Sequence, residues 1–444
     1  MNKIPNNKTA HRSKGSILII TIWVTIVLAS LALIFARTQR VTAFYSANTL
    51  AQLQASMILD GAVQYVEASI VNAEGSEDLE DELLFEAMEV EDAGYFWVIR
   101  PPEYEMDLFP EYGLIPENCK LNLNTATVEM LQMLPGMTTE LAASIIDWRD
   151  EDDEITEGGA ESEYYLLESN PYSAKNMPFE RVEELLLLKD VTPEVLYGED
   201  TNLNGMLNDP EDDGELSAPL DDGNGTLEMG LFRYLTVYSS DKNVDAEGAE
   251  RINISETSAR ADLQSLLEET FDEEQAMAVL NMIPSGTTFQ NIFDFYFRSG
   301  LEPDEFEEIA DRLTTSGETD LPGLININRA PWEVLVCLPG LEESDVELLF
   351  NNRSEDEEGI AWVVEVLERE KAVSIGALVT GRSSQYSADI VSVNQNGRAF
   401  QRAQIVIDPD ASPSKILYWK SISHLGWPLD REILETLRAG DALE

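Results

Sequence analysis

The sequence predicts an α+β fold in which a long amino-terminal helix packs on a small antiparallel sheet, accompanied by helix-hairpin-helix-like repeats. Three observations predict it. A 21-residue apolar run from Ser16 to Ala36 continues into a stretch with Ala, Leu and Ile at three- and four-residue spacing, as in one long helix. The carboxyl-terminal segment alternates apolar and polar residues around Asn396-Gly397, which is typical of a β-hairpin. Between these segments, a motif ending in Leu-Pro-Gly recurs with helical patterns around it.

Composition limits the functions that this chain of 444 residues can have. Asp and Glu number 84 against 29 Lys and Arg, giving a formal charge of −55. Such a surface repels phosphate backbones and attracts divalent cations or basic partners, although solubility alone also explains it. The two histidines make a multi-histidine zinc site or a His-based catalytic triad improbable. Cys119 and Cys337 are too few for a disulfide framework, and the sequence leaves open whether they pair.

The amino-terminal helix begins after a basic leader of 15 residues that contains no acidic side chain. At about 1.5 Å per residue, the apolar run spans roughly 30 Å, the thickness of the hydrocarbon core of a membrane. The basic flank favours the cytoplasmic side for the leader, which places the acidic bulk of the chain across the membrane. The run is long and lacks a small-residue cleavage motif at its distal end, which argues against a secretory signal. A plain signal anchor remains the alternative.

Gly15 stands directly before the apolar run, and this junction resembles a prepilin-type signal, in which a peptidase cuts after the glycine. The resemblance implies that the mature chain begins at Ser16 and keeps its hydrophobic helix. Most prepilin-like proteins carry Glu at the fifth mature position, where it pairs with the amino terminus of a neighbouring subunit. Here that position is Ile20, which suits the first subunit at a fibre tip.

The strands of the expected sheet come from both ends of the remaining chain. An acidic connector over 75–92 leads to "GYFWVIRPPEY", which predicts a strand ended by two prolines. From about residue 372, the predicted hairpin and then "KILYWKSISHLGW" supply further strands. The amino-terminal helix is expected to cover one face of this sheet.

The middle of the chain contains an internal repeat. "LNLNTATVEMLQMLPGM" (121–137) matches "ININRAPWEVLVCLPGL" (325–341), and a fainter copy begins at Arg251. Each copy predicts a short extended piece, a Thr or Ser N-cap, a helix and a tight turn. This is the helix-hairpin-helix pattern, which is associated with DNA backbones but also serves as a packing unit. The acidic run from Asp150 to Glu154 after the first hairpin argues against phosphate binding.

One acidic segment, "DTNLNGMLNDPE" (200–211), satisfies the calcium-loop pattern D-x-[DN]-x-[DN]-G-x5-E. Alternate side-chain oxygens converge on one ion in such a loop, and the glycine permits the sharp turn. The predicted ligands are Asp200, Asn202, Asn204, the backbone carbonyl of Met206 and Glu211. Pro210 disfavours a regular exiting helix, so the loop is expected to lie outside a paired EF-hand. An acidic turn without an ion is the alternative, and Asp221 or Asp222 adds a weaker candidate nearby.

A second acidic segment, "DWRDEDDEITEGGAESEYY", concentrates carboxylates that repel one another unless they are solvated or neutralised. Asp150 and Asp152 with Glu161, which the Gly158-Gly159 turn brings back, form a second candidate calcium site. A solvated acidic loop explains the same spacing. Calcium at either place is expected to be structural, because neither segment implies a substrate pocket.

The combination of features resembles the minor pseudopilin K family of the type II (general) secretion pathway. The resemblance rests on the Gly15 leader, the absence of Glu at position 20, and four stretches of sequence. These are "KLNLNTATVEMLQMLPGMTTELAASIIDWRD", "GGAESEYYLLESNPYSAKNMPFERVEELLLLKDVTPEVLYG", "YLTVYS" and "LININRAPWEVL". The family implies a pilin-like head with a large inserted helical domain, calcium in that domain, and prepilin peptidase processing at residue 15 with methylation of Ser16. It also implies a place at the pseudopilus tip with pseudopilins I and J.

The resemblance and the patterns together give the expected domain organisation. Leader 1–15 precedes the helix 16–74, of which 16–36 is transmembrane. The remaining expected parts are the first part of the head (75–115), the inserted domain with calcium loops (116–235), a second helical region (236–360) and the carboxyl-terminal strands of the head (361–444). The segment 200–320 is longer than the resemblance to the family leads us to expect.

The predicted function is that of a non-enzymatic minor pseudopilin anchored in the bacterial inner membrane, with its bulk in the periplasm. The alternative is a membrane-anchored helix-hairpin-helix receptor for nucleic acid, which predicts basic hairpin turns where this sequence has acidic ones. A nucleophile elbow, a P-loop, a dinucleotide fingerprint and a metalloprotease helix are all missing from the sequence, which disfavours an enzyme.

Overall fold

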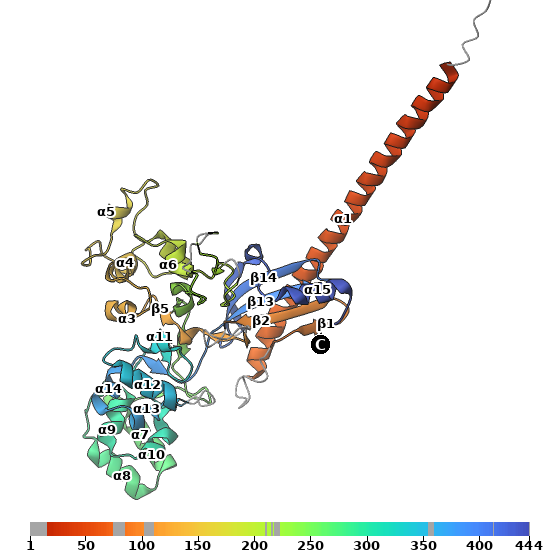
Figure 1. Cartoon of the computed structure of the whole chain (residues 1–444). Coiled ribbons are helices and arrows are strands. Elements are labelled where there is room, and N and C mark those ends of the chain that lie inside the picture. Colours follow the sequence, from red (N-terminus) through yellow and green to blue (C-terminus); the bar gives the residue numbers. More distant parts are fainter. Residues whose placement is uncertain are drawn as a thin grey trace, which may run out of the picture.

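The fold is seen in a computed structural model, which describes residues 16–73, 85–101, 111–208, 211–214, 216, 223–353, 359–411 and 413–443. Figure 1 shows a long helix whose last part lies against a sheet, with a separate body of short helices beside that sheet. The arrangement is the α+β fold that the sequence predicts: a long amino-terminal helix, an antiparallel sheet and further helices.

Helix α1 (Ser16–Ala73) ends within one residue of its predicted boundary. Its first half is exposed, and this apolar stretch is long and hydrophobic enough to cross a membrane. From Ala51 onward one side becomes buried at helical spacing. The buried residues are Ala51, Ala55, Ile58, Leu59, Ala62, Val63, Val66 and Ile70. The first half of this continuous helix is therefore exposed and apolar, and one side of its second half belongs to the hydrophobic core.

The sheet is antiparallel, with strand order β1-β2-β13-β14-β15; β3 also pairs with β2, and β4 pairs with β13. The strands are β1 (Met88–Val90), β2 (Gly94–Arg100), β3 (Glu111–Tyr112), β4 (Ile115–Pro116), β13 (Tyr386–Asn394), β14 (Phe400–Asp408) and β15 (Lys415–Ser421). The predicted hairpin joins β13 to β14, and Gly397 takes the left-handed conformation (φ +61°) that its turn requires.

Helices cover both faces of this sheet. Ile390 and Ile405 pack with α1 on one face, and Val391 and Val393 point to the other face. There, Leu434 and Leu437 of α15 (Arg431–Ala439) pack on Trp97. The prediction of strands alone for the carboxyl-terminal segment was therefore wrong. The end signals of this helix were readable: the Asp430 side chain caps its start, and Gly440 stands at its end (φ +87°).

The helical domain is inserted between β4 and β13. Its helices are η1 (Glu117–Cys119), α3 (Val128–Gln132), α4 (Thr139–Arg149), α5 (Ser162–Tyr165), η2 (Val182–Leu187), α6 (Pro193–Tyr197), η4 (Leu231–Tyr234), η5 (Thr257–Ala259), α7 (Arg260–Thr270), α8 (Glu273–Met282), α9 (Ile292–Ser299), α10 (Pro303–Ala310), α11 (Trp332–Leu335), α12 (Glu343–Asn352), α13 (Val363–Val366) and α14 (Arg369–Ile375). The head resumes later than the predicted residue 361, because α13 and α14 still belong to this domain.

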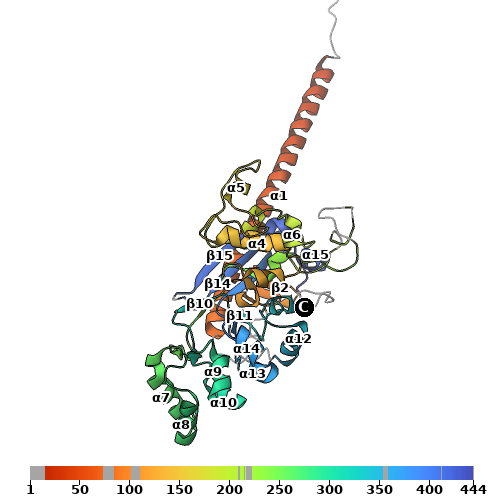
Figure 2. The ribbon, with the colours of Figure 1, turned by 90° about the vertical axis from the view of Figure 1, so that its left-hand side faces the viewer.

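The inserted domain consists of three units, each closed by a two-residue parallel strand pair. The pairs are β5 (Leu121–Asn122) with β6 (Leu235–Thr236), β8 (Ile252–Asn253) with β9 (Leu313–Thr314), and β11 (Ile325–Asn326) with β12 (Val379–Thr380). We call the segments 121–236, 252–314 and 325–380 unit 1, unit 2 and unit 3. An antiparallel ribbon of β7 (Ser240–Lys242) and β10 (Asp320–Pro322) stands at the base of unit 2. In Figure 2 the helices of unit 2 lie at the opposite end of the molecule from the amino-terminal part of α1.

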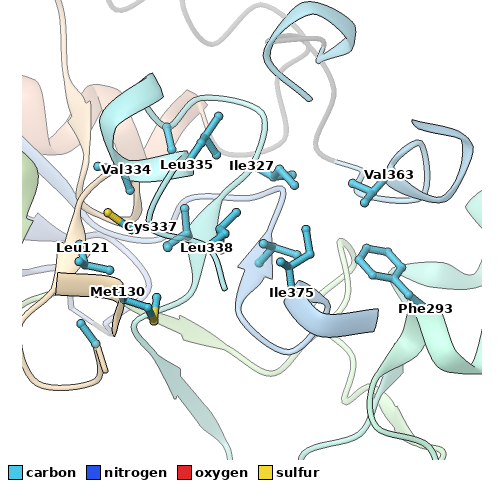
Figure 3. Packing of buried hydrophobic residues seen from close by; sticks show 14 of the residues in the cluster. Leu121, Met130, Phe293, Ile327, Val334, Leu335, Cys337, Leu338, Val363 and Ile375 are labelled. Atoms are coloured by element: carbon cyan, nitrogen blue, oxygen red, sulfur yellow. The ribbon is translucent and has the colours of Figure 1, made fainter. Parts of the chain in front are cut away.

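A repeated asparagine fixes the first turn of each unit, and in units 1 and 3 it also bonds to the segment after the closing strand. Asn122, Asn253 and Asn326 each accept a hydrogen bond from the N–H two residues later, at 2.9–3.1 Å. The amides of Asn122 and Asn326 also donate to the segment that follows their closing strand. Figure 3 shows the units sharing one core, with Leu121 and Met130 of unit 1 beside Cys337 and Leu338 of unit 3.

The predicted N-caps occur only in the first copy. Thr127 accepts a hydrogen bond from Met130 N at 3.3 Å, whereas Pro331 precedes α11 without a side-chain cap. In the fainter copy, which begins at Arg251 and lies in unit 2, Glu256 precedes η5, again without a side-chain cap. The prediction of a Ser or Thr cap in every copy was therefore wrong. Whether these units act as helix-hairpin-helix motifs stays a prediction.

Candidate functional site

The predicted calcium loop folds as a series of turns around Asp200, which is 7% exposed. Its Oδ1 accepts a hydrogen bond from Asn204 N at 3.1 Å, and its Oδ2 accepts one from Gly205 N at 2.8 Å. Leu203 and Gly205 both have positive φ (+56° and +71°), so the chain reverses sharply here. Each carboxylate oxygen has two acceptor sites, so these hydrogen bonds leave Asp200 able to bind a cation.

The other predicted ligands surround the same turn. The side-chain oxygens of Asn202 and Asn204 accept hydrogen bonds from the N–H groups of Asn204 and Met206, both at 2.9 Å. Glu211 closes the loop, because its carboxylate accepts from Thr201 N at 3.0 Å and from Asn208 N at 3.0 Å. The five predicted residues therefore lie in one compact loop. Pro210, Asp221 and Asp222 lie outside the described residues.

Two buried carboxylates in one loop carry an electrostatic penalty. Burial, together with the charge of Glu211, raises the pKa of Asp200 to about 6, against the lowering effect of the hydrogen bonds from Gly205 and Asn204. Burial also raises the pKa of Glu211. A bound cation relieves this penalty, because it stabilises both ionised groups. The donor set of carboxylate and amide oxygens is the chemistry that calcium prefers.

The second acidic segment forms a buried polar site at the end of α4. Three carboxylate oxygens there are buried without a hydrogen-bond partner: Asp147 Oδ2, Asp150 Oδ1 and Glu161 Oε1. The Asn176 side-chain oxygen is also buried and unpartnered. Asp152 is exposed and accepts a hydrogen bond from Glu154 N at 2.8 Å. Buried acceptors without donors are what a cation or ordered water satisfies.

Sequence reasoning found Asp150 and Glu161 in this site but missed two others. Asp147 of α4 lies three residues before Asp150, the C-cap of this helix, so this spacing was a readable signal. Asn176 carries no such signal, because only the fold brings it to this segment, where its amide donates to the carbonyl of Asp152 at 2.6 Å.

In the second site, as in the 200–211 loop, burial raises the pKa values of the carboxyl groups. Burial raises the pKa of Glu161 to about 7, helped by the charges of Asp147, Asp150 and Asp153. The pKa of Asp150 is raised by burial and by its acidic neighbours. A Cβ atom at Gly159 would lie 2.1 Å from Asp147 Oδ2, so a larger residue there would have to displace this carboxylate.

No three Asp, Glu, His or Cys side chains in the described parts of the chain are arranged so that they could hold a metal ion. An ion at either place therefore needs amide, backbone carbonyl or water oxygens as well as carboxylates. Both segments offer Asn side chains for this purpose.

The two thiols are not part of either site: Cys119 and Cys337 are free and buried, and burial raises the pKa of each to about 12.

The residues predicted for processing lie at the other end of the molecule. Ser16 is the first residue of α1, and Ile20 on the same helix is 58% exposed. Gly15 lies outside the described residues.

Comparison with known proteins identifies one part of the chain. Residues 120–197 match the family described as "Type II secretion system (T2SS), protein K". The match confirms the resemblance over this segment, which contains most of unit 1 and the second acidic site. No curated protein matches the chain. Among solved structures, "The Crystal Structure of the GspK-GspI-GspJ complex from enterotoxigenic Escherichia coli Type 2 Secretion System" matches with a TM-score of 0.37 and 14% identity, over 83% of this chain and 96% of that chain.

Proposed function

We propose that this chain is a non-enzymatic minor pseudopilin of a type II secretion system, which starts or caps the pseudopilus during protein export. The observation that carries the proposal is the protein K match over 120–197, because the matched segment belongs to a domain inserted into a sheet that packs on a long apolar amino-terminal helix. Family and architecture thus support the same role.

The two halves of α1 fit such a role. The first half is exposed and apolar, as a segment that lies among lipids must be. The second half is fixed to the head by packing and by hydrogen bonds, including one from Ser392 Oγ to the carbonyl of Ala55 at 2.8 Å. A subunit of this shape has its helix in the inner membrane and its acidic bulk in the periplasm, with the basic leader on the cytoplasmic side.

The proposed partners follow from the family. Pseudopilins I and J would join this chain at the fibre tip, and prepilin peptidase would cut after Gly15 and methylate Ser16. The nucleic-acid receptor is the weaker alternative. The acidic segment from Asp150 to Glu154 follows the first hairpin directly, and a surface of that charge repels phosphate groups.

Calcium is the proposed structural cofactor of the inserted domain. At most two of Asp147, Asp150 and Glu161, together with the Asn176 side chain and water, would bind one ion directly, since buried oxygens of these residues have no hydrogen-bond partner among the described residues. Asp200, Asn202, Asn204, Met206 and Glu211 would hold the other. The ions would neutralise carboxylates in segments that carry little hydrophobic content, and would thereby stiffen the domain.

Mass spectrometry of the protein extracted from membranes tests the proposed processing. We expect a chain that begins at a methylated Ser16 and lacks residues 1–15. Gly15→Phe should keep its leader, whereas Ile20→Glu, the matched control on the same helix, should be processed normally. A native chain that begins at Met1 or well past residue 36 contradicts the proposal.

Co-purification tests the proposed assembly. The full chain, co-expressed with I-type and J-type pseudopilins and extracted in detergent, should elute as a ternary complex. Retention of duplex DNA at physiological salt, with no association with either pseudopilin, would instead support the receptor.

A further inference from the structure

The 200–211 loop belongs to unit 1 by sequence but packs against the head. Arg402 of β14 is fully buried and reaches this loop. Its Nη1 donates to the carbonyl of Asn202 at 2.5 Å, and its Nη2 donates to the carbonyl of Leu203 at 2.8 Å. The backbone of the loop is therefore hydrogen-bonded to the centre of the sheet.

Arg402 is itself fixed by the neighbouring strand. Asp389 of β13 accepts hydrogen bonds from its Nε, at 2.8 Å, and from its Nη2. A buried guanidinium with both edges occupied has little freedom, because any movement leaves a charge unpaired. The carbonyls of Asn202 and Leu203 consequently have one position in which they complete the hydrogen bonding of Arg402.

The other side of the loop contacts two further parts of the head. The Asn204 amide nitrogen donates to the carbonyl of Pro428, just before α15, at 2.9 Å. Gly205 lies against Pro101, next to the end of β2, so closely that a Cβ atom would be 2.5 Å from the Pro101 side chain. Three separate segments of the head thus surround one turn of the loop.

Asn202 and Asn204 each contact both the inside of the loop and the head. Their side-chain oxygens lie inside the loop, where the calcium pattern places two ligands. The Asn202 carbonyl and the Asn204 amide nitrogen face the head. A change that reorients the Asn204 side chain therefore also disturbs its contact with Pro428, whereas Asn202 contacts the head through its backbone carbonyl.

We propose that the 200–211 loop is a cation-controlled clamp that fixes the inserted domain to the head. A bound cation holds Asn202 and Asn204 in the orientation in which they contact Arg402 and Pro428. Without the cation, Asp200 and Glu211 repel each other, the loop loosens, and these contacts weaken. By linkage, docking of the head onto the loop also raises the affinity of the loop for the cation. This inference rests on the calcium proposal for this loop.

Hydrogen exchange on the full chain in detergent tests the clamp, with calcium chloride compared with a chelator. We expect calcium to slow exchange in 200–208 and also in 402–404 and 427–430, by about tenfold, within the usual range of such couplings. Slower exchange in the loop with no change in the head overturns the clamp and leaves the calcium proposal standing. No change in either region overturns both.

Asn204→Asp separates the two roles of this side chain. The variant keeps the calcium pattern, which accepts Asp at this position, but it replaces the donor to Pro428 with a carboxylate oxygen. Calcium should still slow exchange in the loop but no longer in 427–430. Asn202→Asp is the matched control, because its contact with the head is through its backbone carbonyl. Equal protection of 427–430 in the two variants contradicts the proposal.

Discussion

The head and the inserted domain differ in how they are held together. The head has nine-residue strands, β13 and β14, whose alternate side chains enter two apolar layers under α1 and α15. The inserted domain is built from strands of two or three residues and many helices of four or five residues. Its turns are fixed by polar side chains that bond to the backbone, such as Arg149 with the carbonyls of Leu123 and Ala126. Apolar burial has no preferred direction, whereas such polar contacts require a specific distance and angle.

The two regions should therefore respond differently to single substitutions. Removing a large buried apolar side chain should be costly in either region, because both have a close-packed apolar core. In the inserted domain, removing a single buried polar group should also be costly, because groups such as the Asn326 side chain satisfy several buried partners. Four predictions test this contrast, in order of decreasing effect.

The largest effect is expected for Trp97→Ala in β2. Trp97 is 1% exposed and packs edge-on against Trp427, so its removal should destabilise the head by about 3–5 kcal/mol. Hydrogen exchange should accelerate in β2, β13 and β14 while α4 and α12 of the inserted domain keep their protection. Trp419→Ala in the edge strand β15 is the matched control, because that side chain is 44% exposed and should cost less than about 1 kcal/mol. Equal effects of the two variants would contradict the description of the head.

Asn326→Ala should be the most damaging single polar change in the inserted domain. Asn326 is fully buried; it accepts a hydrogen bond from Asn328 N and donates to the carbonyl of Gly381 and to Ser383. Removing the side chain leaves buried partners unsatisfied, at about 2–3 kcal/mol. Asn253→Ala at the equivalent place in unit 2 is the control, because the amide of Asn253 donates to Glu256 at 3.4 Å and lies near the surface. It should cost less than about 1 kcal/mol in the same thermal unfolding measurement, and a reversed order contradicts the prediction.

The same contrast explains which elements of the two regions could be predicted from the sequence. In the head, α1 and the hairpin at Gly397 were predicted correctly, because helical and two-residue periodicities are local signals. In the inserted domain, the closing strands β6, β9 and β12 were missed, since two residues carry no periodicity. Their shared Leu-Thr or Val-Thr pairs become visible only after the three units are aligned. The second acidic site was half found for a similar reason: Asp150 and Glu161 are close in sequence, but Asn176 is brought there by the fold.

A pH effect is expected at the base of unit 2, where Asp241 of β7 is buried. Burial raises its pKa from 3.8 to about 7, against the lowering effects of hydrogen bonds from Thr380 and Asn118 and the charge of Arg251. The unfolded chain therefore loses this proton first, so the contribution of Asp241 to stability falls as pH rises from about 4 to 7. Below that window the group is neutral in both states and carries no penalty.

Asp241→Asn isolates this contribution from the many other carboxylates. The difference in melting temperature between variant and wild type should favour the variant more at pH 7.5 than at pH 5, with chelator present in both. Asp320→Asn in the partner strand β10 is the control: its pKa is lowered by hydrogen bonds from Lys242 and Thr319, so its contribution has the opposite sign. A wild-type minus variant difference that is flat with pH contradicts the assignment.

The smallest effect is expected at a helix cap in unit 1. Thr138 Oγ1 accepts a hydrogen bond from Leu141 N at 3.1 Å and caps α4, the helix that ends at the second acidic site. Thr138→Ala should therefore destabilise the domain by about 1 kcal/mol, while Thr138→Ser keeps the acceptor and should be nearly neutral. Because α4 also carries Asp147, we expect the Ala variant to lower calcium affinity slightly as well, measured by titration calorimetry on the full chain. If Thr138→Ala cost as much stability as Trp97→Ala, the prediction would be contradicted. Loss of one cap hydrogen bond would then disturb the whole inserted domain and not only its own helix.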